Sequence, residues 1–573
     1  MMNLGRLRPG ALYVLPGAAL AVVLAIIVSK VIFKAPEYDE AEVLHASWLI
    51  ARGGKMWVDI FEHHSPLFNT INAWLFPDSI FFVLYAKCFC LTLYLLQAYL
   101  FSVACYLWLG VPPAFRLSFC VYAVVAYSAL TWPVDIGVIR PENYSMFSLM
   151  AGSVSGYYVG KTCSFRSYTF AFWTVFFLAL SLSFSPRSVF LDTGVGLAVL
   201  WTLRGRQDWA IVLVAMGLGG CAVILLNLMI APLSGFYLWM VDFNLHLRPY
   251  RRLWQASYGS VAVGVFLVFF NALLIFVKIA AAGSGRLGAL MAGRPASWVS
   301  AFADCRLLVA QLGVIVCWLY VFADQVWGRQ SFGAVAVASS FCVVVLAAAT
   351  FRIAETASGN VRAGNERAGR GDDLGAWVRT ALRRPLARSI GILLALALVS
   401  GAGAVLYLSV DKVRLIIARL QPSGMLRDMS LAVNEKSFRL RAADELLPLS
   451  EAKNLGEWLL WSKRYCELFR NDRILAMPLR HPICARDASF YWYAGEHFRA
   501  MAQENVGFVP NPPYRVAEDI LRTKPAFIDT APLGDSILPN PAVEAMLQAE
   551  YVPVRSPVIG SWAWLRKDFL ARP

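Results

Sequence analysis

Residues 34–67 read KAPEYDEAEVLHASWLIARGGKMWVDIFEHHSPL. This polar stretch lies between two apolar runs, near 11–33 and 79–110, and each is long enough to cross a bilayer, because a spanning helix needs roughly 20 apolar residues. The first run follows Arg6 and Arg8. It is longer than the apolar core of a signal peptide, so we expect it to remain as a first helix. Residues 34–67 are therefore predicted to form a loop at the membrane surface.

The composition of the whole chain is that of a membrane protein. Of its 573 residues, 58% are hydrophobic and 16% are charged, whereas soluble globular domains carry more charge and fewer apolar residues. Hydropathy predicts an α-helical polytopic membrane protein with about eleven spans. The predicted spans lie near 11–33, 79–110, 113–131, 143–160, 168–184, 188–204, 209–231, 257–279, 305–324, 332–350 and 389–410. Residues 185–188 are either a tight turn between two short helices or a break within them.

The orientation follows from the basic residues near the span ends. Alternate loops hold Arg6 and Arg8, Arg116, Lys161 and Arg166, Arg204 and Arg206, Arg286 and Arg294, and then the eight arginines of residues 351–388. These loops are predicted to be cytoplasmic. The other loops, 34–78, 132–142, 232–256 and 325–331, are then external. This bias also accounts for the net charge of +15, so no nucleic-acid partner is expected.

Four regions are predicted. Residues 1–350 form a transmembrane module with the external loop 34–78, residues 351–388 a cytoplasmic Arg/Gly-rich linker, and residues 389–410 the last span. Residues 411–573 are predicted to be a small mixed α/β domain, periplasmic or extracellular, of a multi-pass inner (plasma) membrane protein with a cytoplasmic N-terminus. Its predicted helices lie near 427–447 and 450–469, and its strands near 473–478, 524–530 and 551–557.

Two features of this C-terminal region stay open at the level of sequence. Cys466 and Cys484 could form a disulfide if the region is external, or remain free thiols. The segments 480–483 and 487–493 are rich in aromatic and polar side chains. They could contact an acceptor glycan or form a compact aromatic core.

Two short helices are predicted within the first loop. Ala41, Leu44 and Trp48 follow one another at helical spacing, and Gly53-Gly54 is typical of a helix end. We therefore expect an amphipathic helix on the membrane surface, with Asp39 and Glu40 at its N-terminal end.

The second helix is predicted to begin at Ser65-Pro66, a favourable N-cap and first-position pair. Glu62, His63 and His64 then lie in the turn between the two helices. The loop thus gathers carboxylates and imidazoles at the level of the lipid head groups.

These side chains suit transfer of a sugar from a lipid phosphate. A carboxylate can deprotonate an acceptor hydroxyl as general base, and nearby cations can neutralise the departing phosphate. Arg140 and Arg187 are the candidate cations, because interfacial or intramembrane arginines are candidates for function. Alternatively, Arg140 forms a salt bridge with Glu142 or Asp135, and Arg187 is an interfacial anchor.

The motif Tyr-Asp-Glu-Ala, followed by Arg-Gly-Gly and Asp-Ile-Phe-Glu-His-His-Ser-Pro-Leu, resembles the GT-C glycosyltransferase superfamily. More narrowly, it is similar to dolichyl-phosphate-mannose protein mannosyltransferases and aminoarabinose (lipid A) transferases. Ile139-Arg140-Pro141-Glu142-Asn143 is a second match, since relatives often have Arg-Pro and an acidic or polar residue in the next external loop. The resemblance covers roughly the first six spans.

The resemblance implies a polyprenyl-phosphate-sugar donor, a catalytic base at Asp39 with Glu40 beside it, and a second loop carboxylate at Glu62. Many relatives have Lys-Pro-Pro or His-Pro-Pro after that glutamate, whereas this chain has His63-His64-Ser65-Pro66. His63, His64, Arg140 and Arg187 are then expected to bind substrate. The expected partners are the donor, a glycan, lipid or protein acceptor, and membrane lipids.

Other interpretations compete with this one. Asp39 and Glu40 could cap a helix, and Glu62 could pair with Lys55 or His63. His63, His64 and Asp39 could hold a divalent cation, although their spacing fits no closed zinc motif; the metal requirement stays open. A lipid or glycan transporter without covalent chemistry, or an assembly subunit of the envelope, are the alternatives to a glycosyltransferase.

Overall fold

The computed structural model describes the first loop, the helices that follow it, and parts of the C-terminal region. The described residues are 24, 27–28, 31–36, 38–56, 65–75, 81–111, 113, 116–131, 139–162, 165–203, 206–235, 337, 340–341, 344, 422–436, 438–440, 446, 449, 452–470, 472–475, 516–529, 540–555 and 562–570. The predicted spans near 257–279, 305–324 and 389–410 lie outside them, as does the linker 351–388.

Each of the predicted spans between 79 and 231 contains a helix. These are α4 (Phe82–Leu109), α5 (Arg116–Thr131), α6 (Pro141–Val159), α7 (Phe165–Phe184), α8 (Val189–Thr202) and α9 (Trp209–Ile230), which is followed by the short α10 (Leu233–Gly235). Within the described residues, α4, α7 and α9 are long and apolar enough to cross a membrane. The chain is thus a membrane protein, while the total of about eleven spans stays a prediction.

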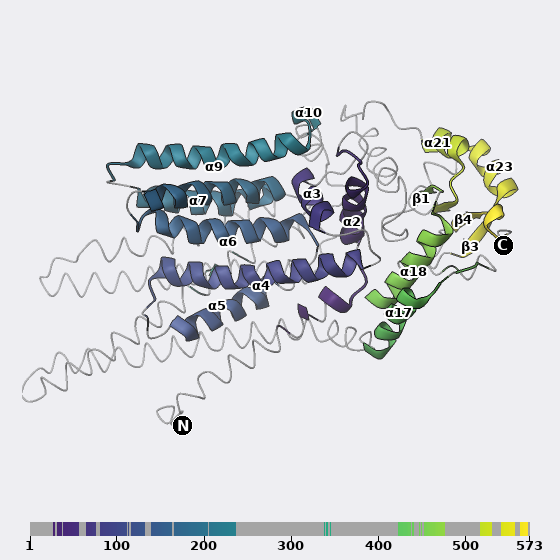
Figure 1. The fold of residues 1–573 in the computed structure, drawn as a ribbon, viewed down its shortest axis with the longest axis horizontal. Helices are drawn as coiled ribbons and strands as arrows, with labels where there is room; N and C mark the ends of the chain where they lie inside the picture. Colours follow the sequence, from purple (N-terminus) through teal and green to yellow (C-terminus); the bar gives the residue numbers. More distant parts are fainter. Residues whose placement is uncertain are drawn as a thin grey trace, which may run out of the picture.

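The helices pack side by side as a bundle (Figure 1). Two glycines allow close approach, because a side chain at either position would meet a neighbouring helix. A Cβ atom on Gly219 of α9 would lie 2.3 Å from the carbonyl oxygen of Phe172 in α7, and one on Gly156 of α6 would lie 2.5 Å from Val199 in α8. Small residues at such contacts are the usual means of packing membrane helices.

Residues 185–188 form a tight turn between two helices, which was one of the two predicted alternatives. Ser185 has an extended backbone (φ −144°, ψ 109°), and Pro186–Ser188 then make a single 3₁₀ turn, η4, that leads into α8. The turn reverses the chain at the end of α7 and places α8 against α6 and α7.

The two predicted loop helices are α2 (Tyr38–Ala51) and α3 (Pro66–Leu75). Figure 1 shows α2 lying across one end of the bundle, with α3 beside it. As predicted from Gly53-Gly54, α2 ends where Gly53 adopts a left-handed backbone (φ +91°), a conformation open to glycine at little cost.

The prediction that α2 is amphipathic is wrong for most of its length, whereas its position at the membrane surface stays a prediction. All eight residues from Glu40 to Ser47 are buried. The polar ones include Glu40, Glu42 and His45. The helix is covered on both faces because α3, the end of the bundle and other parts of the chain pack around it. A hydrophobic pattern cannot reveal polar side chains that are buried by long-range contacts.

The described C-terminal residues form a mixed sheet with helices. The elements are α17 (Pro422–Asn434), α18 (Leu455–Leu468), β1 (Ile474–Leu475), α21 (Val516–Thr523), β2 (Phe527–Asp529), α23 (Pro541–Glu550), β3 (Tyr551–Arg555), β4 (Trp562–Arg566) and η11 (Lys567–Phe569). The strand order is β1-β2-β4-β3, in which only β1 and β2 are parallel. Strands β1, β2 and β3 lie within the predicted strand segments, whereas β4 was not predicted.

Successive residues of a strand point to opposite faces of the sheet, and helices cover both faces. Phe527 of β2 and its partner Leu565 of β4 pack into a cluster with α18. Ile528 and its partner Trp564 pack with α21 and α23 on the other face. The first of these clusters continues to α2, α3 and α4, so the C-terminal elements are joined by apolar contacts to the end of the bundle that carries the loop.

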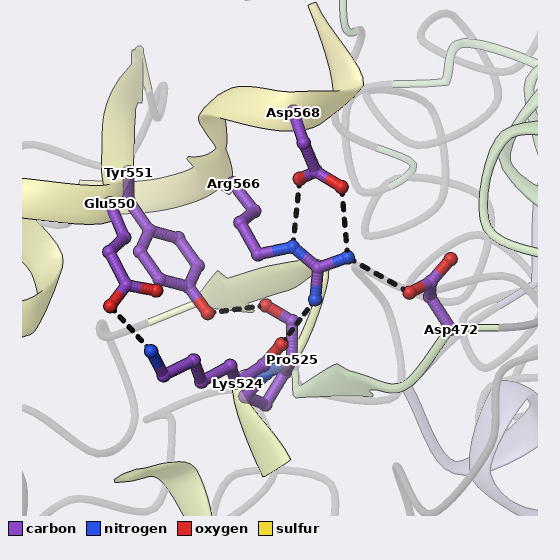
Figure 2. A network of polar contacts seen from close by, with 7 residues as sticks. All are labelled: Asp472, Lys524, Pro525, Glu550, Tyr551, Arg566 and Asp568. Carbon is purple, nitrogen blue, oxygen red and sulfur yellow. Dashed lines mark hydrogen bonds and ion pairs between the residues drawn. The ribbon is translucent and has the colours of Figure 1, made fainter. Parts of the chain in front are cut away.

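A polar network links the end of β4 to the segments just before β1 and β2 (Figure 2). The guanidinium of Arg566, at the end of β4, makes two hydrogen bonds to Asp568 (2.8 and 3.1 Å), one to Asp472 (3.0 Å) and one to the carbonyl oxygen of Lys524 (2.6 Å). Beside it, Tyr551 donates to the carbonyl oxygen of Pro525 (2.7 Å).

Cys466 of α18 is disulfide-bonded. This excludes the alternative of a free thiol at that position. Cys484 lies outside the described residues.

Candidate functional site

The first turn of α2 carries the two acidic residues that the sequence singled out. The backbone of Asp39 lies in this turn, and its side chain is outside the described part of the structure. The side chain of Glu40 is described and is 1% exposed. A carboxylate buried this deeply needs charged or polar partners, because the uncompensated burial of a charge is very costly.

Lys87 of α4 is the charged partner of Glu40. Its Nζ lies 3.0 Å from Oε2 and 3.3 Å from Oε1 of Glu40, and both side chains are 1% exposed. The ion pair joins the loop helix α2 to the second turn of α4. Charge-assisted hydrogen bonds of this kind are stronger than neutral ones, so the pair fixes the first turn of α2 against the bundle.

A second contact of Glu40 reaches the segment that leads into α6. The backbone N–H of Ile139 donates a hydrogen bond to Glu40 Oε1 at 3.2 Å. Ile139 immediately precedes Arg140, and Glu40 immediately follows Asp39. The structure therefore brings together the two loop segments that carry the candidate base and one candidate phosphate ligand, although they are 101 positions apart in the sequence.

Arg140 is the N-cap residue of α6. Its backbone is extended (φ −144°, ψ 152°), Pro141 follows in the first turn, and the side chain is half-buried. The N-terminus of a helix favours anions, since its first N–H groups and the helix dipole point outward. An arginine at this position adds a full positive charge to that end of α6.

The start of α6 is held rigidly by amide side chains. Gln97 of α4 donates to the carbonyl oxygen of Asn143 (2.6 Å) and contacts its side-chain oxygen, while Asn143 donates to the carbonyl oxygen of Cys90 (3.0 Å). Tyr127 of α5 donates to Gln97 (3.0 Å). Buried networks whose members are hydrogen-bonded rigidify their surroundings, and this one fixes the helix that Arg140 begins.

The second loop helix is tied to the same turn of α6. The hydroxyl of Tyr144 donates to Asn72 Oδ1 of α3 at 2.5 Å, and its ring packs edge-on against Phe68 of α3 at 4.8 Å. Helix α2 is thus attached to the second turn of α4 and the segment before α6, and α3 is attached to the first turn of α6. The two loop helices are therefore part of the folded end of the bundle.

The turn that contains Arg187 lies against this end as well. Ser145 of α6 hydrogen-bonds to Ser181 of α7 (3.0 Å), which in turn donates to Ser188 of η4 (3.0 Å) and Asp192 of α8 (3.1 Å). Ser188 also contacts Asp192. The backbone of Arg187 lies in η4, next to the first turns of α6, and its side chain is outside the described part of the structure.

The remaining predicted site residues are not placed. Glu62, His63 and His64 lie outside the described residues, so their roles stay predictions. Among the residues that the structure does describe, no group of three or more His, Cys, Asp or Glu side chains could hold a metal ion. The two loop histidines and the carboxylate of Asp39 are not part of that set.

Sequence reasoning missed two ionisable residues of this end of the bundle. Lys87 and Asp192 each interrupt an otherwise apolar predicted span, and an ionisable side chain within a span is a candidate for function. That signal was present for both. The partner of Lys87 could not be inferred, because Glu40 is 47 residues away in the sequence.

Comparison with known proteins adds little. No protein-family model matches the chain, and no curated protein matches it. Among solved structures, the structure of this chain is similar to that of the arabinosyltransferase EmbB from Mycobacterium smegmatis, with 15% sequence identity and a TM-score of 0.39. The match covers 60% of this chain and 31% of the EmbB chain, so the chain spans about a third of that protein.

Proposed function

We propose that the chain is an integral-membrane glycosyltransferase that transfers a sugar from a polyprenyl-phosphate donor to an acceptor at the external membrane face. Asp39 is the general base. Arg140 and Arg187 bind the donor phosphate, and Glu62, His63 and His64 complete the site. The proposal rests on the residues of this chain and on the resemblance of its first loop to GT-C enzymes.

The observation that carries the proposal is the hydrogen bond between Glu40 and the N–H of Ile139. It joins the turn of α2 that contains Asp39 to the residue before Arg140. Transfer from a lipid phosphate requires a base for the acceptor and a cation for the leaving group on either side of one sugar carbon. The two segments that meet here supply one residue of each kind.

The proposed step is a single displacement. The acceptor hydroxyl oxygen attacks the anomeric carbon while Asp39 takes the hydroxyl proton. The bond between that carbon and the phosphate oxygen breaks, and its electron pair leaves with the polyprenyl phosphate. Arg140 and Arg187 neutralise the charge that grows on the phosphate, which is the part of the transition state where fixed positive charge stabilises most.

The test is a comparison of surface glycans in cells. A deletion strain complemented with wild-type chain should regain a sugar that mass spectrometry finds missing from its envelope glycans. The same strain complemented with Asp39→Asn should lack it, since loss of a general base lowers rates by roughly 10²–10⁴. Glu544→Gln, an exposed acid of α23, is the matched control and should restore the sugar.

Two outcomes would contradict the proposal. The first is full restoration of the glycan by Asp39→Asn at equal membrane abundance. The second is an unchanged set of envelope glycans in the deletion strain, together with loss of transport of a lipid or glycan. That result would favour a transporter.

A further inference from the structure

We infer that Lys87 is a positioning residue of this site. It holds Glu40 in place, and Glu40 in turn connects α2 to the segment before α6 through its hydrogen bond with Ile139; these contacts are called the joint below. The inference rests on the proposed function, since it assigns the joint a role in aligning the base with the donor. It also separates the two acids of the first turn: Asp39 is the base, and Glu40 is a structural joint.

The contacts of Glu40 leave it poorly suited to be the base. Both carboxylate oxygens lie within 3.3 Å of the Lys87 ammonium, and Oε1 also accepts the N–H of Ile139. Because both oxygens are engaged by these donors, the carboxylate is held in place and is not free to meet an acceptor hydroxyl. With a 1% exposed side chain, Glu40 is also shielded from any acceptor in solvent.

Stability alone does not account for a buried lysine here. Removing two charges from water costs about as much as their attraction returns, and a well-packed apolar pair is often equally stable. What an apolar pair cannot provide is an acceptor for the N–H of Ile139. The ion pair therefore allows a carboxylate to be buried where three distant parts of the chain meet.

Those three parts are the first turn of α2, the second turn of α4 and the entry to α6. Lys87 fixes Glu40 to α4, and Glu40 fixes the backbone of Ile139 to α2. Asp39 and Arg140 are the immediate neighbours of the two joined residues. Because a displacement of about 1 Å between reacting groups can cost roughly 100-fold in rate, the joint controls catalysis without touching substrate.

Three variants separate the charge pair from the joint. Lys87→Met removes the Lys87 ammonium from the buried Glu40 carboxylate. The double variant Glu40→Gln with Lys87→Met removes both charges but keeps an amide oxygen for the N–H of Ile139. The exchange Glu40→Lys with Lys87→Glu keeps the opposite charges but places an ammonium, which cannot accept a hydrogen bond, at position 40.

Each variant, in lipid nanodiscs, is assayed by thermal unfolding, by deuterium exchange of the peptide that contains Ile139, and by transfer from a radiolabelled undecaprenyl-phosphate sugar. Lys87→Met should lower kcat roughly tenfold or more with less than about a threefold change in donor KM, and should speed exchange at Ile139. The neutral double variant should recover both. The variant with swapped charges, Glu40→Lys with Lys87→Glu, should have an unfolding midpoint near that of wild type. It should nevertheless show fast deuterium exchange at Ile139 and a low kcat.

A neutral double variant as slow as Lys87→Met, with raised donor KM, would overturn the inference, because Lys87 would then act on the donor directly. Wild-type turnover in the charge exchange would also overturn it. If wild-type chain transfers no sugar, the proposed function fails. Deuterium exchange at Ile139 alone then tests whether Lys87 and Glu40 hold the segment before α6 against α2. If deuterium exchange at Ile139 were unchanged both in Lys87→Met and in the variant with swapped charges, this positioning role would be refuted.

Discussion

Asp39 and Glu40 are neighbours of the same charge type, and we propose different roles for them. Glu40 is buried against an ammonium and a backbone N–H, so its position is fixed. The proposed role of Asp39 needs a carboxylate that can meet an acceptor. Under the proposal, one helical turn would carry both the base and the residue that fixes its position.

At the other end of the bundle, Arg206 joins two connections between helices. Its Nη1 donates to the carbonyl oxygen of Val159 (2.6 Å) and to Ser167 (3.0 Å), and its Nε and Nη2 bind Asp208 (2.8 and 2.6 Å). The hydrogen bond from Arg206 lowers the pKa of Asp208 to about 2. The pair therefore stays ionised at every physiological pH.

We predict that Arg206→Lys destabilises the bundle, because lysine cannot make the two-pronged contact with Asp208 and reach the α6–α7 connection together. Thermal unfolding in detergent should show a lower midpoint, whereas Arg166→Lys, at an exposed position, should unfold as wild type does. Equal midpoints for the two variants would contradict the role of Arg206.

At the scale of single elements, local sequence signals predicted the helix ends well. Gly53 stops α2 because it can adopt φ +91°, and Pro66 begins α3 because its missing N–H is not needed in a first turn. Ser65 is less well explained. Its hydroxyl has no hydrogen-bond partner within the described residues, so it precedes the helix without capping it through its side chain.

The contact between α7 and α9 gives a prediction at the same scale. Gly219→Ala should separate the helices, because the new methyl group would lie 2.3 Å from the carbonyl oxygen of Phe172. Overpacking of this kind costs about 1–3 kcal/mol. Gly217→Ala, two residues away with no atom within 4 Å of its Cβ, is the control. Unfolding midpoints that fall equally, or not at all, would contradict the packing described here.

At the scale of the whole molecule, the sequence predicted the bundle and the loop but not how they are joined. Hydropathy identifies α4 to α9 one at a time, since each apolar run is local. The contacts of Glu40 with Lys87 and Ile139 join residues 47 and 99 positions apart. No periodicity encodes such contacts. The strand β4 was missed for a related reason, because its five residues become a strand by pairing with both β2 and β3.

Long-range contacts also stabilise the C-terminal sheet. Arg566 binds Asp472, 94 residues earlier, and the backbone of Lys524 (Figure 2). Its hydrogen bonds to Asp568 are the main cause of a raised pKa for Arg566, so it stays charged. Arg566→Met should loosen this region by roughly 1.5–3 kcal/mol.

Deuterium exchange would test that prediction. Peptides of β1, β2 and β4 should exchange faster in Arg566→Met, and those of α4 to α9 should be unchanged. Arg470→Met, at an exposed position, is the control. Unaltered deuterium exchange throughout the sheet would show that Arg566 does not stabilise it.

The reaction that we propose for this end of the bundle is cleavage of a lipid-phosphate sugar with Asp39 as base. The most direct measurement is the release of undecaprenyl phosphate from a panel of radiolabelled undecaprenyl-phosphate sugars by purified chain in nanodiscs, with envelope extract as acceptor. We expect wild-type protein to release undecaprenyl phosphate in an amount matched by labelled acceptor, and Asp39→Asn to release at least roughly 100-fold less. Equal release by the two proteins, or none from any donor, would contradict it.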